Sequence, residues 1–213
     1  MRIDLPLQVQ QIIHTLERHG YEAYAVGGCV RDSLLGRTPQ DWDITTSAKP
    51  EQVKELFTHT IDTGIEHGTV TVMMERMGYE ITTYRIDGEY EDARHPKEVT
   101  FTVDLYEDLR RRDFTINAMA YNETQGLVDA FDGEKDLAAG IIRCVGKPHD
   151  RFGEDALRML RAVRFAAQLG FAIEPDTLTA IRDLAQNLRA VSAERIQMEL
   201  VKLLTSAHPD AMR

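Results

Sequence analysis

The sequence has few cysteines, no long apolar run and no secretion signal, and each shortage excludes a class of protein. Only two of its 213 residues are cysteines, Cys29 and Cys144. They are too few for a disulfide framework or a thiolate metal cage, so we expect both to be small buried side chains. No apolar stretch approaches the ~20 residues that span a bilayer, which excludes a membrane protein. The N-terminal segment has neither the basic start nor the apolar core of a signal peptide, which predicts a cytoplasmic location.

Basic residues are also in deficit, because 25 Lys and Arg face 35 Asp and Glu and the formal net charge is −10. Surfaces that bind nucleic acid are normally built from clustered Lys and Arg, so this balance argues against broad electrostatic capture of RNA. Two basic runs exist within the acidic average, one at residues 110–112 and one of four arginines at residues 151–164. Any contact with RNA must therefore be local, and solvated helix faces are the alternative interpretation of both runs.

The apolar pattern predicts an α+β unit followed by an all-α unit, and the length of the chain suits two domains. The first helix is predicted from four apolar residues at helical spacing, with Gly20 as its stop: Val9, Ile12, Ile13 and Leu16. Alternation and turn residues predict strands at 22–26, 41–46, 68–75 and 79–85, a short helix at 29–36, and a turn at 77–78. Beyond about residue 140 we expect only helices, including one ended by Gly170 and two near 175–187 and 192–205.

Two further segments stand out in this pattern. Residues 86–98 are polar and carry Gly, Pro and five acidic groups, which is typical of a mobile functional loop. The last predicted helix has an apolar face with little of the chain left to pack against it: Ile196, Leu200, Leu203 and Leu204. We therefore expect further domains after this chain.

Two carboxylates, Asp41 and Asp43, flank Trp42 in a segment with the composition of a strand. Because side chains alternate along a strand, both carboxylates would point to one face, about 7 Å apart. Oxygen-only ligands suit Mg²⁺, and two such ions can hold the attacking hydroxyl and the leaving pyrophosphate of an in-line displacement. Glu80, on a neighbouring predicted strand, is the candidate third ligand. Two solvated acids on a surface strand are the alternative.

The segment GGCVRD lies shortly upstream of this pair. Gly27 and Gly28 allow backbone N–H groups to approach a phosphate at the start of a helix, and Arg31 can neutralise a triphosphate. A glycine turn, a cation and two carboxylates in this order favour nucleotide chemistry over a solvated surface.

Four motifs in order carry a resemblance to a known family: AVGGCVRDSLLGRTPQDWDITTSA at 25–48, GEYEDARHP at 88–96, EDLRRRDFTINAMAY at 107–121 and GEDALRMLRAVRFAAQLGF at 153–171. The chain resembles the class II tRNA nucleotidyltransferases and bacterial poly(A) polymerases of the polymerase-β-like superfamily. The resemblance implies a nucleotidyltransferase head with a mixed five-stranded sheet over residues 1–139. It also implies an all-α neck over 140–213 that is truncated before body and tail domains.

The same resemblance implies the roles of individual residues. Asp41 and Asp43 would be the catalytic ligands of Mg²⁺. Eight further residues would join Gly28 in binding the nucleotide: Arg31, Arg111, Arg112, Asp113, Asp155, Arg158, Arg161 and Arg164. The flexible loop associated with switching from C to A addition would include Glu89, Tyr90, Asp92 and Arg94.

Glu154, Asp155 and Arg158 match the family's base-template motif, and residues three apart share one face of a helix. Cytosine and adenine both present an exocyclic amine beside a ring nitrogen, whereas guanine and uracil present a carbonyl beside an N–H group. An Asp that accepts and an Arg that donates therefore suit C and A, because each mispaired buried group costs about 1–3 kcal/mol. An ordinary helix salt bridge between Asp155 and Arg158 is the alternative.

These residues together predict an enzyme that adds CMP and AMP to the 3′ end of tRNA, with CTP and ATP as substrates and no protein partner inferred. Within the family the alternatives are a poly(A) polymerase and a partial enzyme that adds only CC or only A. The sequence DTGIEHGTV at 62–70 departs from the GRRFR-like stretch of bacterial poly(A) polymerases, which favours CCA addition. From another class, the alternative is a noncatalytic nucleotide- or RNA-binding module.

Overall fold

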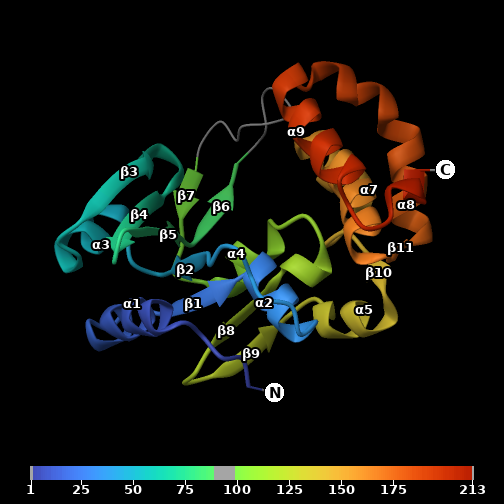
Figure 1. Cartoon of the computed structure of the whole chain (residues 1–213). Coiled ribbons are helices and arrows are strands. Elements are labelled where there is room, and N and C mark those ends of the chain that lie inside the picture. The colour runs from blue at the N-terminus through green and yellow to red at the C-terminus, as the bar shows by residue number, and fades with distance from the viewer. Residues whose placement is uncertain (1, 89–98, 213) are drawn as a thin grey trace. The chain divides into compact units, whose positions relative to one another are not determined.

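The computed structural model describes residues 2–88 and 99–212 (Figure 1) and divides into two compact units. The first comprises Met1–Asp87, Val99–Arg112 and Asn117–Phe131, and the second includes Asp113–Ile116 and Asp132–Arg213. The sequence predicted a change at residues 139/140, whereas the long continuous part of the second unit already begins at Asp132. Local pairing explains the difference, because Asp136 accepts hydrogen bonds from Thr115 and Arg143, both residues of the second unit.

The first unit is built on a seven-stranded sheet, in the order β3-β4-β5-β2-β1-β8-β9. Its strands are β1 (Ala23–Val26), β2 (Ile44–Thr46), β3 (Thr60–Gly64), β4 (Thr69–Met74), β5 (Met77–Thr83), β8 (Met119–Asn122) and β9 (Gly126–Asp129). Among the described strands of this sheet, β2 and β5 form a parallel pair and the other neighbours are antiparallel. The α+β class is confirmed, but the expected number of five strands is wrong. The edge strands TIDTG and GLVD are short and lack the alternation that identifies a strand in sequence.

Helices and a small ribbon complete the first unit. They are α1 (Leu7–Arg18), α2 (Gly28–Leu34), α3 (Pro50–Leu56), α4 (Leu105–Arg110), the 3₁₀ turn η1 (Ile65–His67), and the hairpin of β6 (Arg85–Asp87) with β7 (Val99–Phe101). The predicted first helix is confirmed, and the same four apolar residues are its buried ones. An apolar cluster at the centre of the sheet includes Tyr24, Tyr84 and Leu109, against which Phe131 packs.

The turn between β4 and β5 lies at Glu75 and Arg76, two residues before the predicted position. Both residues have positive φ, +49° and +70°, as a type I′ hairpin turn requires. Gly78 is instead part of β5, where a Cβ atom would come within 2.9 Å of the Thr71 side chain. The glycine that indicated a turn is therefore explained by close packing across the hairpin.

The second unit is mostly helical. Its elements are the 3₁₀ turn η2 (Thr115–Asn117, which ends in the first unit), α5 (Gly133–Ala139), β10 (Ile141–Ile142), α6 (Pro148–Glu154), α7 (Leu157–Leu169), β11 (Ala172–Ile173), α8 (Pro175–Leu184), η3 (Ala185–Ala190), α9 (Ala193–Leu204) and η4 (Pro209–Met212). Strands β10 and β11 form a short parallel pair that the sequence did not indicate. Gly170 ends α7 with a φ of +72°, as predicted.

Helices α7 and α9 are joined by a buried ion pair. The Arg164 guanidinium donates to the Glu199 carboxylate, and both side chains are only 8% exposed. Arg164 also lies over the ring of Phe165, 4.0 Å from the ring centre. Of the α9 face expected to lack a partner, Leu203 is buried whereas Leu204 is exposed.

The sequence predicted two buried cysteines and no helix that spans a membrane. Cys29 and Cys144 are both buried and unpaired, as expected. Burial raises the pKa of the Cys29 thiol to about 11, although bonds to backbone oxygens oppose this. Among the described residues, no helix is both long enough and apolar enough to span a bilayer.

The ion pair between α7 and α9 leads to a prediction about stability. Glu199→Leu would leave the Arg164 guanidinium buried without its carboxylate, which should lower the free energy of unfolding by about 3–5 kcal/mol. The double change of Glu199→Leu with Arg164→Met should recover most of the loss. Urea unfolding measures both variants. Asp183→Ala, which removes the exposed partner of His149, is the control and should cost less than about 1 kcal/mol.

Candidate active site

Asp41 and Asp43 lie in the segment that leads into β2, not on a strand as predicted. The strand begins at Ile44, and the last link to β1 is the bond from the Val26 amide to the Asp43 carbonyl (3.0 Å). Only Asp43 of the pair is therefore tied to the sheet through its backbone. Both carboxylates remain at the surface.

Glu80 adjoins this pair, as the sequence suggested. Strands β2 and β5 pair with Ile44 opposite Ile81, so the residues that precede them, Asp43 and Glu80, are neighbours across the sheet. Asp43 keeps access to solvent, but the protein crowds its carboxylate. The partial loss of water around the Asp43 carboxylate raises its pKa, the charge of Arg112 opposes the rise, and the charges of Glu80 and Asp41 add to it.

A crowded set of carboxylates favours a hard divalent cation, because oxygen ligands and negative charge are what such ions require. Within residues 2–88 and 99–212, no three His, Cys, Asp or Glu side chains gather closely enough to hold a metal ion by themselves. Asp41 and Asp43 fit a site that is completed by water or by phosphate oxygens of a substrate. Glu80 as a direct ligand stays a prediction.

The glycine turn that precedes α2 is held by residues distant in sequence. Gly27 has a φ of +79° and a ψ of −125°, a conformation that suits glycine alone, whereas Gly28 has helical geometry as the first residue of α2. The Arg31 side chain is buried, and its guanidinium donates to Asp32 and to the Asn117 side chain (2.7 Å). Asn117 was not singled out in the sequence, because nothing local connects it with Arg31.

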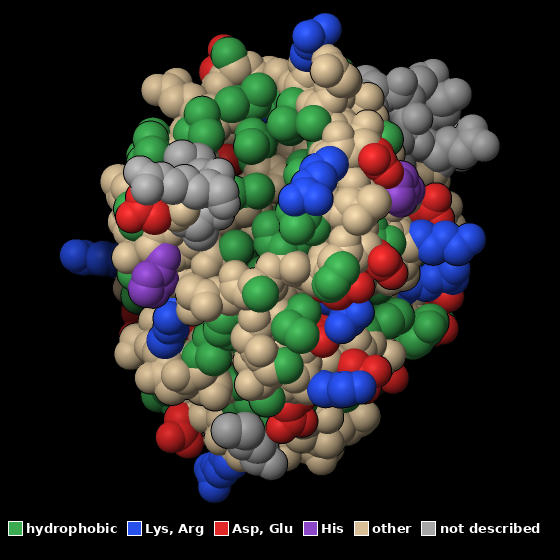
Figure 2. Space-filling model, turned by 90° about the vertical axis from the view of Figure 1, so that its right-hand side faces the viewer, with side chains coloured by type: hydrophobic (Ala, Val, Ile, Leu, Met, Phe, Trp, Pro, Cys, Tyr) green, Lys and Arg blue, Asp and Glu red, His purple; other side chains and the backbone are tan. Residues whose placement is uncertain are grey.

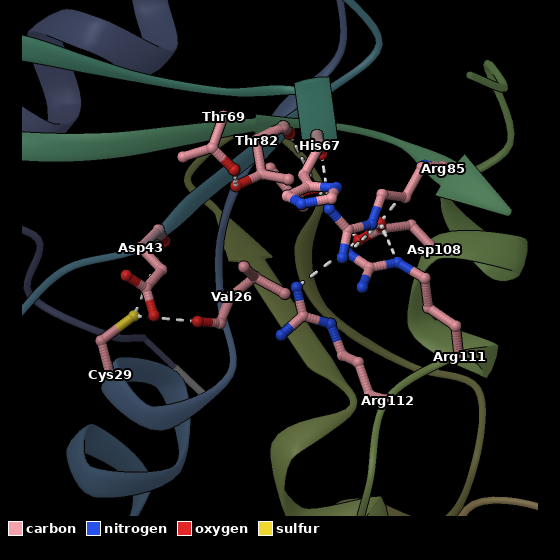
Figure 3. A network of polar contacts seen from close by, with 11 residues as sticks. Val26, Cys29, Asp43, His67, Thr69, Thr82, Arg85, Asp108, Arg111 and Arg112 are labelled. Carbon is pink, nitrogen blue, oxygen red and sulfur yellow. Dashed lines mark hydrogen bonds and ion pairs between the residues drawn. The ribbon is translucent and has the colours of Figure 1, made fainter. Parts of the chain in front are cut away.

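The arginines that follow α4 are gathered by a carboxylate that the sequence analysis did not select. In Figure 3 the side chains of Arg111 and Arg112 both point toward Asp108. One Asp108 oxygen accepts from Arg111 Nε (3.0 Å) and Nη2 (2.8 Å), and the other accepts from Arg112 Nη2 (3.5 Å) and from the Thr45 hydroxyl (3.0 Å). Asp108 is fully buried. Burial alone raises its pKa, but Arg111 and Arg112 outweigh this effect and hold the pKa below its usual value.

Of the two arginines held by Asp108, Arg112 is the one that lies near the carboxylate pair and the glycine turn. Its charge lowers the pKa of Asp43, and its Nη1 atom lies 3.0 Å from the place where a Cβ on Gly27 would be. The first unit therefore brings together the predicted residues Asp43, Arg112 and the glycine turn, with Glu80 beside them. Asp108 precedes Arg111 by three residues and Arg112 by four. This spacing is the signal in the sequence that could have identified Asp108 as their shared partner.

In the second unit, Asp113 is engaged by another predicted residue. One of its oxygens accepts from Arg161 Nε (2.8 Å) and Nη2 (2.6 Å), and the other accepts from the Phe114 amide (2.8 Å). Asp113 is buried. Its predicted contact with a ribose hydroxyl would thus require a hydroxyl to share or replace the bonds from Arg161.

The three residues of the predicted base template do not share a helix face, which corrects the expectation. Asp155 lies between α6 and α7 in an extended conformation, where its carboxylate caps the Leu157 amide (3.0 Å) and accepts from Arg195 Nη2 (2.8 Å). Arg158 instead pairs with Glu154 (2.6 Å). The helix salt bridge between Asp155 and Arg158 is also wrong. The break between α6 and α7 places the three residues on different elements.

The predicted site residues also include Arg164 and four residues of the flexible loop. Arg164 is buried against Glu199 and takes part in the packing of α7 and α9, and its contact with a nucleotide stays a prediction. Glu89, Tyr90, Asp92 and Arg94 lie outside the described residues.

Residues 23–143, more than half of the chain, match the family model of the poly A polymerase head domain. The chain belongs to the poly A polymerase head domain family. Residues 170–212 match a second model, described as a probable RNA- and SrmB-binding site of polymerase A. Nucleotidyltransferases of this family generally use a divalent metal ion, which agrees with the carboxylate donors of the first unit.

Solved and curated proteins extend the likeness over nearly the whole chain. A CCA-adding enzyme of Levilactobacillus brevis is 54% identical over 93% of this chain and 50% of the relative. A crystal structure of the Bacillus stearothermophilus CCA-adding enzyme in complex with CTP matches with a TM-score of 0.88 and 48% identity, over 96% of this chain and 50% of that one. The Thermotoga maritima CCA-adding enzyme complexed with tRNA matches with a TM-score of 0.79 and 26% identity, over 99% and 53%. The chain thus spans about half the length of these relatives.

The two glycines before Arg31 allow a matched test. Gly27→Ala should lower the free energy of unfolding by about 1–3 kcal/mol, because alanine is strained at this φ and its Cβ would contact Arg112. Gly28→Ala is the control, since its Cβ would meet only Arg31 Nη2 at 3.7 Å, and its cost should stay below about 1 kcal/mol. Equal losses for the two variants in chemical denaturation would contradict the assignment of the turn to Gly27.

Proposed function

We propose that this chain carries the catalytic and nucleotide-selecting parts of a CCA-adding enzyme, which joins CMP and AMP to the 3′ end of a tRNA. The observation that carries the proposal is the carboxylate pair, Asp41 and Asp43, which leads into β2 beside Glu80 and beside the glycine turn that the Arg112 guanidinium approaches. More than nine tenths of this chain is similar to proteins named CCA-adding enzyme, which supports the addition of CMP and AMP as the reaction.

The reaction proposed is an in-line displacement on the α-phosphate of a nucleoside triphosphate. The 3′-hydroxyl oxygen of the RNA forms a bond to the α-phosphorus, the bond from this phosphorus to the bridging oxygen of pyrophosphate breaks, pyrophosphate leaves with the electron pair, and the hydroxyl proton passes to water. Asp41 and Asp43 would hold Mg²⁺, which when bound supplies positive charge to the reacting phosphate oxygens. Arg111 and Arg112 would bind the triphosphate, since a planar guanidinium offers forked donors to phosphate oxygens.

Base selection is assigned to residues of the second unit. Asp155 can accept from the exocyclic amine of cytosine or adenine, and Arg158 can donate to the adjacent ring nitrogen. In the chain by itself the Asp155 carboxylate accepts from Arg195 and Arg158 donates to Glu154, and these bonds hold the two side chains in place before a base arrives. A base with the opposite pattern would leave buried donors and acceptors unpaired.

The proposed partners rest on related proteins and on the surface of this one. Relatives solved with CTP and with tRNA support these two ligands. ATP as the second substrate, the absence of a protein partner and the cytoplasmic location stay predictions. On the face that Figure 2 shows, Lys and Arg side chains are interspersed with Asp and Glu, which fits local contact with RNA better than broad capture.

Poly(A) polymerase is the second candidate, because the matching family model bears that description. The lengths of the extended RNA products distinguish a CCA-adding enzyme from a poly(A) polymerase. The chain is incubated with Mg²⁺ and a tRNA that lacks its CCA end, with CTP alone, ATP alone or both. CCA addition should give two added residues with CTP and three with both nucleotides. A long ladder with ATP alone would favour poly(A) addition, and no Mg²⁺-dependent extension would favour a noncatalytic binding module.

Removal of either central carboxylate should abolish the transfer of nucleotides. Asp41→Asn and Asp43→Asn keep the shape of the side chain but lose the charge that a divalent ion requires. Single-turnover rates should fall by at least about 10²-fold, the order of loss seen when one group that stabilises a transition state is removed. Asp62→Asn, an exposed carboxylate paired with Lys54, is the control and should keep the original rate. A normal rate for Asp43→Asn at saturating Mg²⁺ is the outcome that contradicts the assignment.

The base-selection role predicts a change in specificity. Arg158→Ala should reduce the preference for CTP and ATP over UTP and GTP by about tenfold or more, because one buried donor to the base is lost. Arg151→Ala is the matched control, since Arg151 is the other basic partner of Glu154 (2.7 Å) but is not assigned to the base. Incorporation efficiencies of all four nucleotides give the measurement. An unchanged preference in Arg158→Ala would remove this residue from the template.

A further inference from the structure

We infer that Asp108 is a positioning residue that fixes Arg111 and Arg112 in the geometry needed to bind the triphosphate; this inference rests on the proposed function. Each Asp108 oxygen serves a different arginine. Arg111 donates two bonds to one oxygen, at 3.0 and 2.8 Å, and Arg112 donates one to the other, at 3.5 Å. The three side chains come from the end of α4 and the turn after it (Figure 3).

The balance of charge explains why a carboxylate is required here. Two adjacent guanidinium groups repel each other, and the repulsion is strong where the protein excludes water. One buried anion between them makes their closeness favourable and leaves an excess of one positive charge. That excess is available to an anionic ligand, whereas a second carboxylate would have cancelled it.

Arg112 is only partly satisfied by the protein. Its Nε atom is buried and has no hydrogen-bond partner among the described residues. A buried donor without a partner costs free energy, so its retention needs an explanation outside the stability of the fold. A phosphate oxygen that approaches the open part of this guanidinium can supply the missing acceptor.

Asp108 also links the arginines to the strand that follows the carboxylate pair. The Thr45 hydroxyl donates to it at 3.0 Å, and Thr45 is two residues beyond Asp43 on the same chain segment. The Arg85 amide, at the start of β6, is a further donor at 3.4 Å. The position of Arg112 relative to Asp43 therefore depends on one buried carboxylate.

A purely structural role for Asp108 makes a different prediction from a positioning role. If the carboxylate only supported the fold, its loss would weaken the binding of every ligand alike. If it positions the arginines, its loss should weaken only the part of the affinity that comes from phosphates. The ratio of affinities for CTP and for cytidine isolates that part, because both ligands carry the same base and ribose.

The experiment measures the dissociation constants of CTP and cytidine by calorimetric titration of the chain. In Asp108→Asn the amide can still accept one bond, but its NH₂ group faces donors of the arginines. The CTP-to-cytidine affinity ratio should fall about 10- to 100-fold, the loss expected for hydrogen bonds to charged groups. Asp108→Glu retains the charge and should keep more of the ratio than Asp108→Asn. Glu107→Gln removes the neighbouring carboxylate of α4, which pairs with Arg110, and should leave the ratio unchanged.

Each outcome has a defined meaning. An unchanged ratio in folded Asp108→Asn overturns the inference, as does an equal loss of CTP and cytidine affinity. If Asp108→Asn does not fold, the test uses Asp108→Glu, whose longer side chain displaces the arginines and should still lower the CTP-to-cytidine affinity ratio, and an unchanged ratio in this variant overturns the inference. The unmodified chain tests the proposed function separately. If it binds CTP no more tightly than cytidine, the proposed binding of the triphosphate is refuted, and this inference is refuted with it.

Discussion

Burial of the Asp108 carboxylate is the constraint on which the first unit depends. A buried ionised carboxylate is costly unless charged partners and hydrogen bonds surround it. Here the acceptor lies on α4, and the donors come from the turn after that helix, from β2 and from the start of β6. Satisfying one anion thus brings together three parts of the chain that are distant in sequence, and the same arrangement brings Arg112 close to the carboxylates before β2.

The second unit shows the same principle with smaller pairs. Three predicted site carboxylates each form an ion pair with an arginine of the same unit. The pairs are Asp113 with Arg161, Asp155 with Arg195 and Glu154 with Arg158. Polar groups held in this way lose little side-chain entropy when a ligand replaces one partner. Ligand binding by such residues is an exchange of hydrogen bonds, and its specificity depends on how well the ligand reproduces the bonds that it displaces.

The sequence predicted the features that depend on local pattern. Spacing of apolar residues identified α1, and a glycine after a periodic run identified the end of α7. It did not predict features that depend on distant contacts: the start of β2, the hairpin turn at Glu75, the edge strands, and the extended Asp155. The residues of the proposed active site were predicted from motifs, but Asp108 was missed because its burial is created by strands and helices far away in the chain.

The interleaving of the two units has a consequence for how such a protein can change over generations. The chain leaves the first unit after Arg112, returns at Asn117 and leaves again after Phe131. A recombination event in the gene between the codons for residues 113 and 131 would therefore separate parts of both units at once. Neither unit is encoded by one uninterrupted stretch of the gene, so a single crossover at any point leaves part of one unit joined to the other.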